Sequence, residues 1–278
     1  MLKKFSLLLA MSIFLFGCAQ KAVSEAQLHS LGHIIDLKTK QTISLTELLT
    51  RLATYTYVLI GEEHDQFVHH QIESYLVQNL EQKRPLAAVV VEMLAVDQQA
   101  QVTQLQTTRT PLSAQQTAQQ IDWRNWDWKL YQHFILSRLA SRTPLVAANL
   151  TDAEIQTLYT GAKPLRGKIS TAPQVQQQLT QLIQQHHPMQ PELLAKALSV
   201  QQFRDRRMAE MLVKNAKNST AYTVLVAGNN HVRKDLGVPL HLQDFDPQNQ
   251  AKTISIMLKS QRTEPVTLQQ ADYVWFTE

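Results

Sequence analysis

The stretch YVLIGEEHDQFVHHQIESYLVQNL, residues 57–80, decides the fold of this 278-residue chain. Its first four residues form a continuous apolar run, the pattern expected of a strand covered on both faces of a sheet. A polar turn follows, and Asp65 then stands where a helix N-cap is expected. The apolar side chains of the next stretch lie on one helical stripe: Val68, Ile72, Tyr75, Leu76 and Leu80. A buried strand that leads directly into an amphipathic helix is typical of an α/β fold.

The same alternation continues along the rest of the chain. Further apolar runs of strand length are residues 87–91, 145–148, 222–227, 254–258 and 271–276. Helical patterns cover residues 128–140, begin again at Thr151-Asp152, and cover 191–214. Two glutamine-rich stretches, 98–120 and 174–190, predict solvated helices and linkers that form a helical insertion over the sheet. The sequence therefore predicts an α/β fold with a mostly parallel β-sheet flanked by helices.

Polar and ionisable side chains follow the main predicted strands at the point where each strand ends. They are, in chain order, Glu62 and His64, then Glu92, then Asn149, then Asn229, Asn230 and His231. Because the carboxyl ends of parallel strands share one edge of a sheet, where open α/β folds bind ligands, we expect a functional cleft there. The alternative is that these residues only cap strands at the protein surface. That alternative explains a single strand end better than it explains all four.

The first eighteen residues resemble a bacterial lipoprotein signal. A positive start with Lys3 and Lys4 precedes a mostly apolar run, residues 5–16, that is too short to span a bilayer comfortably. Gly17 then stands directly before Cys18. We therefore expect a signal peptide at 1–17, a lipidated Cys18, a tether over 18–32 and a folded domain over 33–278. Ala19 after the cysteine favours the outer membrane, on its periplasmic face. The alternatives are a plain secretory signal or a buried free cysteine in a cytosolic protein.

The composition excludes several familiar chemistries. Because Cys18 is the sole cysteine, intrachain disulfides and cysteine-based zinc or iron–sulfur sites are excluded. The spacing of the seven glycines excludes GxGxxG, GxSxG and Walker A motifs. The sequence also lacks the HExxH pattern of zinc proteases. The formal net charge is +4, and loss of Lys3 and Lys4 with the signal peptide would leave only a weak positive charge. Such a charge predicts no nucleic-acid partner.

Six short segments occur in a fixed order along the chain. They are YVLIGEEHDQFVHHQ (57–71), AAVVVEMLAVDQQ (87–99), WRNWDWKLY (123–131), PLVAANLTDAEI (144–155), QQFRDRRMAEML (201–212) and LVAGNNHVRKDLGVPLHL (225–242). Together they resemble ChaN-type haem-binding lipoproteins, of the haem-uptake and Tiki superfamily, and the resemblance runs from about residue 33 to 275. It implies an α/β protein that binds haem in iron uptake and holds the haem between two subunits of a homodimer. It also implies a tyrosine that ligates iron, a histidine that assists from the partner chain, and an outer-membrane haem receptor as a possible partner.

Haem iron takes an axial His, Met, Cys or Tyr, and the macrocycle needs flat apolar walls. The richest aromatic segment contains Trp123, Trp126 and Trp128, and Tyr131 and His133 follow it. We expect Tyr131 to be the iron ligand. Tyr131 and His133 would point about 200° apart on a helix, so they would serve different subunits. Other tyrosines stay open as iron ligands, and the tryptophans have the alternative of core packing or a protein interface. The remaining tyrosines considered are Tyr55, Tyr57, Tyr159, Tyr222 and Tyr273.

Other residues are expected to help bind the haem. Arg204 is expected to hold a carboxylate such as a haem propionate, and its neighbour Asp205 to orient a histidine. His64 and His231 are also expected to bind the cofactor. The alternative for Arg204 and Asp205 is a pattern of salt bridges within their own helix.

A second hypothesis comes from the superfamily relatives, the erythromycin esterases and Tiki metalloproteases. Under this hypothesis Glu62, His64, Glu92 and His231 form the site of a hydrolase, as an acid and base pair or as ligands of a divalent metal. A third reading is a structural lipoprotein with neither activity. Two histidine pairs, His69-His70 and His186-His187, are not expected to take part. Adjacent helical residues point about 100° apart, and the second pair precedes Pro188 in a glutamine-rich stretch.

Overall fold

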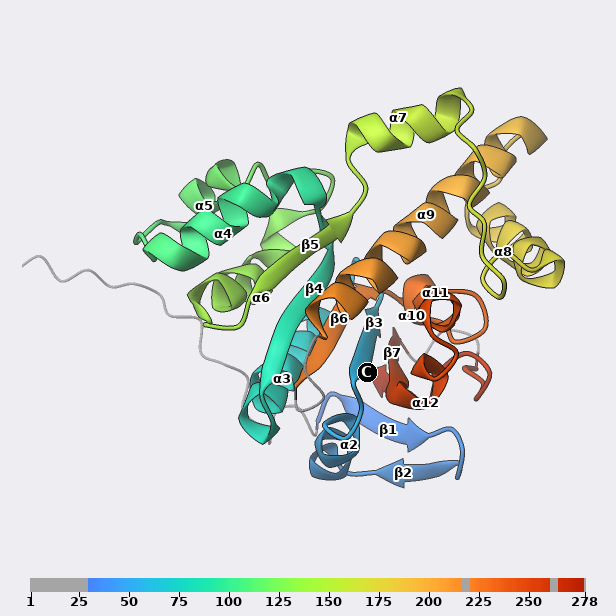
Figure 1. The fold of residues 1–278 in the computed structure, drawn as a ribbon. Helices are drawn as coiled ribbons and strands as arrows, with labels where there is room; N and C mark the ends of the chain where they lie inside the picture. Colours follow the sequence, from blue (N-terminus) through green and yellow to red (C-terminus); the bar gives the residue numbers. More distant parts are fainter. Residues whose placement is uncertain (1–29, 217–220, 261–264, 278) are drawn as a thin grey trace, which may run out of the picture.

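The computed structural model describes residues 30–216, 221–260 and 265–277, and its core is an eight-stranded sheet in the order β2-β1-β8-β7-β3-β6-β4-β5 (Figure 1). The strands are β1 (Gly32–Asp36), β2 (Gln41–Ile43), β3 (Tyr57–Glu62), β4 (Leu86–Ala95), β5 (Leu145–Asn149), β6 (Tyr222–Gly228), β7 (Thr253–Ser260) and β8 (Tyr273–Thr277). The predicted signal peptide, Cys18 and nearly all of the predicted tether lie outside the described residues.

The sheet is mostly parallel, as predicted. Central strand β3 pairs in parallel with β6, which places Leu59 opposite Leu225. It also pairs in parallel with β7, which places Ile60 opposite Ile256. The pairs β4–β6, β4–β5 and β7–β8 are parallel too. The carboxyl ends of β3, β6, β4 and β5 therefore lie at one edge of the sheet.

Two strands, β1 and β2, were missing from the prediction. Strand β1 runs antiparallel to β2 and to β8, with Ile34 opposite Trp275. Both strands are short and covered on one face only, so they lack the continuous apolar run that marks the interior strands. The predicted domain start at residue 33 falls one residue after β1 begins.

The helices agree with most of the predicted ranges. They are α2 (Leu45–Leu52), α3 (Phe67–Lys83), η1 (Val96–Gln98), α4 (Gln99–Thr108), α5 (Ala114–Gln120), α6 (Trp128–Ala140), α7 (Asp152–Thr160), α8 (Pro173–His186), α9 (Pro191–Asn215), α10 (Asn229–Val232), α11 (Val238–Phe245) and α12 (Asn249–Lys252). The prediction of Asp65 as an N-cap is wrong. Residues 63–66 form a turn, in which the Gln66 amide donates to the Glu63 carbonyl, and α3 begins at Phe67, one residue later than predicted.

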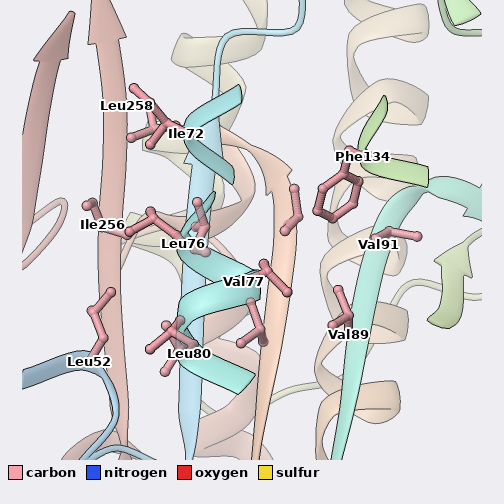
Figure 2. Close-up of a cluster of buried hydrophobic side chains, with 14 of the residues drawn as sticks. Leu52, Ile72, Leu76, Val77, Leu80, Val89, Val91, Phe134, Ile256 and Leu258 are labelled. Carbon is pink, nitrogen blue, oxygen red and sulfur yellow. The ribbon is translucent and has the colours of Figure 1, made fainter. Parts of the chain in front are cut away.

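Helices cover both faces of the sheet. On one face, α2, α3 and α6 pack against side chains of β3, β4, β6 and β7. Figure 2 shows Leu76 of α3 near Ile256 of β7 and Leu80 of α3 near Leu52 of α2, while Phe134 of α6 lies near Val91 of β4. Each of these side chains is fully or almost fully buried, which stabilises the fold by about 1.5–3 kcal/mol per side chain.

The opposite face of the sheet is covered by α9, α10 and α11. Met208 and Leu212 of α9 and Leu242 of α11 pack against alternate sheet residues such as Leu59 and Leu225. Because side chains of one strand point alternately to the two faces, each interior strand must be apolar on both sides. This requirement produces the continuous apolar runs of the sequence.

The two glutamine-rich stretches do not form one insertion. Helices α4 and α5 pack against α6 at the β5 end of the sheet, whereas α8 packs against α9 on the other face (Figure 1). Val102 and Leu105 of α4 are buried, and so are Val175 and Leu179 of α8. In the described part of the chain, no helix combines the length and the apolar character needed to cross a membrane.

Candidate functional site

The structure brings together the ionisable groups that the sequence places at the strand ends. Glu62 is the last residue of β3, and Glu92 lies in the last half of β4. His231 lies on the short helix α10, which begins directly after β6. The Glu92 carboxylate contacts His231, with 3.0 Å between Oε1 and Nε2. The predicted convergence of these strand ends is therefore confirmed.

His231 lies buried between two carboxylates. Its Nδ1 is 2.6 Å from Oδ1 of Asp205, which lies on α9, so Asp205 orients a histidine as predicted. Burial acts to lower the pKa of His231, but the charges of Glu92 and Asp205 outweigh it and raise the pKa to about 10. Burial acts to raise the pKa of Glu92, but His231 overrides this effect and lowers it. These two contacts favour the cationic form of His231 and join α9 to β4.

His64 is the exposed member of the site, with 45% of its side chain accessible. Its Nδ1 donates to Oε1 of Glu62 at 2.5 Å, and its ring packs edge-on against Trp126, with 4.7 Å between the ring centroids. Partial burial acts to lower the pKa of His64, but the hydrogen bond to Glu62 outweighs it and the pKa lies above 6.5. A Cβ atom at Gly228 would lie 2.7 Å from two atoms of the His64 ring, so glycine leaves room for this ring.

Tyr131 lies in the interior of the protein and is only 1% exposed. Its hydroxyl group donates to Oε1 of Glu62 at 3.1 Å, and its ring is surrounded by Trp123, Trp126 and His70. Burial and the carboxylate of Glu62 raise the pKa of the phenol far above its usual value. In this structure the Tyr131 hydroxyl therefore faces Glu62 in the interior and not the surface, and its role as the iron ligand stays a prediction. His133 lies on the same helix, half-buried, and takes no part in the contacts of Tyr131.

Sequence reasoning missed two members of the buried cluster, His70 and Glu73 on α3. The His70 Nδ1 is 3.2 Å from Oε2 of Glu73, and both side chains are buried. Burial raises the pKa of Glu73 to about 7. Both residues are buried in α3. Glu73 lies three residues before Leu76, so an ionisable residue beside the apolar stripe was the available signal. His69 points elsewhere, since its Nδ1 accepts from the Glu63 amide and its Nε2 contacts Thr277.

A small pocket lies beside the strand ends, between Trp126 and α9. It measures about 90 Å³, and its lining includes Met93, Asn149, Ile155 and Arg204. Nε of Arg204 is buried and has no hydrogen-bond partner among the described residues. Ligand cavities usually measure roughly 300 Å³ or more. The pocket therefore admits part of a ligand, and a large flat ligand would have to lie over it on the surface.

A small apolar cluster adjoins this pocket between α7 and α9. Leu150, Leu158 and Val200 form its buried base, and the half-buried side chains packed on that base are Ile155, Tyr159, Ala162 and Phe203. Ile155 belongs both to this surface and to the pocket lining. This set of residues is named the α7–α9 surface below.

Comparison with known proteins places the chain in a family. The family model for haem-binding uptake proteins of the Tiki superfamily, ChaN, matches residues 48–242. The chain belongs to this ChaN family. A solved structure of ChaN from Campylobacter jejuni, described as showing cofacial haem binding, is 30% identical to it, with a TM-score of 0.79. The match covers 89% of this chain and 97% of that chain.

More distant structures resemble this ChaN-family protein in fold alone. An erythromycin esterase in its open conformation is 12% identical over 89% of this chain and 82% of that chain, with a TM-score of 0.49. The type III effector HopBA1 is 12% identical over 83% of this chain and 91% of that chain, with a TM-score of 0.46. No curated protein matches the chain.

The cofactor of the ChaN family is haem, which requires an axial ligand for its iron and apolar walls for its ring. Four of the candidate tyrosines are buried: Tyr57, Tyr131, Tyr222 and Tyr273. Tyr55 is half-buried but precedes β3, at the amino ends of the strands. Tyr159, on the α7–α9 surface, is half-buried among apolar side chains near the carboxyl ends. An apolar surface that carries a partly exposed tyrosine fits the two requirements of a haem site.

Proposed function

We propose that this protein binds haem on the α7–α9 surface and serves haem and iron uptake as a lipid-anchored protein of the bacterial cell envelope. The observation that carries the proposal is the position of Tyr159, which stands partly exposed on an apolar surface at the carboxyl edge of the sheet. Membership of the ChaN family supports haem as the ligand. When bound, haem supplies an iron centre whose properties depend on its axial ligand.

The proposal assigns a role to four side chains of the α7–α9 surface and the adjoining pocket. The Tyr159 phenolate ligates the iron. Ile155 and Phe203 lie beside it and provide apolar contact for the porphyrin ring. Arg204, in the adjoining pocket, pairs with a propionate, because a buried guanidinium nitrogen without a partner favours a carboxylate.

The proposed site requires a second copy of the chain. The pocket of about 90 Å³ cannot enclose a haem, so one face of a haem on the α7–α9 surface would stay exposed to water. The Campylobacter jejuni relative binds haem cofacially. We infer that here too the exposed haem face is covered in a homodimer, so that dimerisation depends on haem.

The proposed anchor and location rest on the sequence. Gly17-Cys18 follows a short apolar signal, and lipidation of Cys18 would tether the domain to the periplasmic face of the outer membrane. A haem receptor of the outer membrane is the proposed partner. Cys18→Ser tests the anchor: we expect labelled palmitate to be incorporated into the wild type and not into the variant. Equal labelling of both would refute it.

Titration of the domain over residues 19–278 with haemin tests the function itself. We expect a saturable Soret shift with a high-spin, tyrosinate-type spectrum. The mass in solution should double when haem is added. A Soret change that never saturates, with a monomer mass throughout, would refute haem binding as the function.

One observation favours a second function, hydrolysis. His64 is exposed and is held by a buried carboxylate, the arrangement of a general base oriented by Glu62. Glu92 and His231 lie behind it and would stabilise developing charge. A screen of ester and amide substrates, with His64→Ala as the matched variant, tests this function. Turnover by the wild type that the variant lacks would establish it, whereas equal background rates would exclude it.

A further inference from the structure

The side chains of Glu62, His70 and Glu73 form a buried cluster on the inner side of His64. One possible ligand atom from each lies within 4.8 Å of those of the other two. Glu62 comes from the end of β3, and His70 and Glu73 come from the first turns of α3. All three residues are buried, so the cluster is not an exposed acidic patch of the kind that is common on protein surfaces.

The hydrogen bonds of His70 fix its tautomer. Its Nε2 lies 3.1 Å from the carbonyl oxygen of His64, and a carbonyl oxygen only accepts, so Nε2 carries the proton. Nδ1 points at Oε2 of Glu73 from 3.2 Å, and it either carries a second proton that it donates to this oxygen or is an acceptor that faces it. Two acceptors that face each other need either a proton or a cation between them.

The two carboxylates each have an oxygen without a partner. Oε2 of Glu62 and Oε1 of Glu73 are buried and make no hydrogen bond within the described residues. Their side chains have no accessible surface, so each oxygen loses its contact with water on folding. Among the described residues, the ion pairs of these two carboxylates are with histidines and none is with a lysine or arginine. Burial of such groups without compensation is costly.

We propose that Glu62, His70 and Glu73 bind a divalent transition-metal cation. Two carboxylates and one imidazole are ligands that Mn²⁺ and Zn²⁺ accept. A divalent cation neutralises the charge of both carboxylates and replaces the missing partners of their free oxygens.

Surrounding residues orient two of the three ligands by hydrogen bonds, as outer residues usually do for metal ligands. The hydroxyl of Tyr131 and Nδ1 of His64 both donate to Oε1 of Glu62, which leaves Oε2 free for the cation. The backbone carbonyl of His64 orients His70. The half-exposed side chain of His64 lies between the cluster and water. Movement of its ring would open a path for the cation. The bound cation ties α3 to the end of β3 and fixes His64 above it.

Metal analysis of the full-length protein in detergent, purified without haem, tests the proposal. The protein is treated with a chelator, incubated with Zn²⁺ or Mn²⁺ alone, and desalted. We expect one cation per chain and a higher thermal unfolding midpoint. Outer partners of metal ligands contribute about 10–100-fold to affinity, so Tyr131→Phe should weaken binding by about that factor and Glu73→Gln by more. Glu81→Gln, on the same helix but paired with Arg138, is the matched control and should bind as the wild type does.

A second measurement covers the case in which Glu73→Gln does not fold. Anomalous diffraction from wild-type crystals soaked in Mn²⁺ or Zn²⁺ should show a peak among the three side chains. A peak elsewhere, such as between His64 and Glu92, would overturn the proposal. So would a stoichiometric cation that Glu73→Gln retains, or the absence of any tightly bound cation. The readouts involve no haem, so they are independent of the proposed haem function.

Discussion

Replacement of Glu92 by glutamine tests the electrostatic account of the strand-end site. The substitution keeps the size of the side chain but removes its charge. In the wild type Oε1 of Glu92 contacts His231 and Oε2 accepts from the Gly228 amide at 2.8 Å. The single oxygen of a glutamine amide can serve one of these two donors in the same way, so either His231 or the Gly228 amide loses its acceptor.

The structure sets the size of the effect. Removing one partner of a buried ion pair costs about 3–5 kcal/mol. The rise in the pKa of His231 from 6.5 to about 10 corresponds to about 5 kcal/mol, at about 1.4 kcal/mol for each pKa unit, shared between Glu92 and Asp205. Glu92→Gln should therefore lower the free energy of unfolding by about 3 kcal/mol. In a chain of this size that lowers the unfolding midpoint by about 6–12 °C.

The pH dependence of this loss provides a sharper test. The lowered pKa of Glu92 stabilises the fold above its unfolded pKa, and this contribution is lost as the pH falls. The raised pKa of His231 stabilises the fold fully below pH 6.5, and this contribution is lost as the pH rises toward 10. The difference between wild type and variant should therefore be largest between about pH 5 and 6.5. Asp205, His64 and Arg204 are the other charged groups near the pair.

Urea unfolding followed by circular dichroism at several pH values measures this difference. Glu47→Gln is the control, because Glu47 forms an exposed pair with Arg51, and such pairs contribute about 1 kcal/mol or less. A loss for Glu92→Gln no larger than that of the control, or a loss independent of pH, would show that His231 is not held as a buried cation.

Two further predictions concern the packing around the site. Gly228→Ala places a Cβ against the half-exposed His64 ring, which should swing away from Glu62. An NMR titration should then find the pKa of His64 shifted back toward 6.5. An unchanged pKa would contradict the close contact between Gly228 and His64. Phe134→Ala removes a fully buried ring that packs between α3 and β4, and urea unfolding should show a loss of about 3–5 kcal/mol, whereas a loss below about 1 kcal/mol would contradict its place in the core.

The interior of the fold was predictable from the sequence because its strands are apolar on both faces. The strands that begin at Tyr57 and Tyr222 could be predicted without knowing their neighbouring strands, because burial on both faces produces a nearly continuous apolar run. The convergence of Glu62, Glu92 and His231 followed from parallel pairing alone. Strand β1 was missed because it is short and not buried throughout, so it lacks the continuous apolar run of the interior strands.

The functional roles of single side chains were less predictable, because they depend on contacts between distant helices. Tyr131 is buried because α6 packs against α3, which brings its ring against His70. The role proposed for Tyr159 depends on the packing of α7 against α9, which places Phe203 in the same apolar cluster. Neither contact leaves a periodic pattern in the sequence. His70 and Glu73 were missed as well, although Glu73 lies next to Ile72 and three residues before Leu76, on the buried side of α3.

The most direct test of the account compares two phenylalanine variants in a haemin titration followed by absorption spectroscopy. Tyr159→Phe removes the proposed iron ligand from the α7–α9 surface, whereas Tyr131→Phe removes only a buried hydroxyl that donates to Glu62. The account predicts that Tyr159→Phe loses the tyrosinate-type spectrum and most of the affinity, and that Tyr131→Phe keeps both. A tyrosinate-type spectrum that survives in Tyr159→Phe, or disappears in Tyr131→Phe, would contradict it.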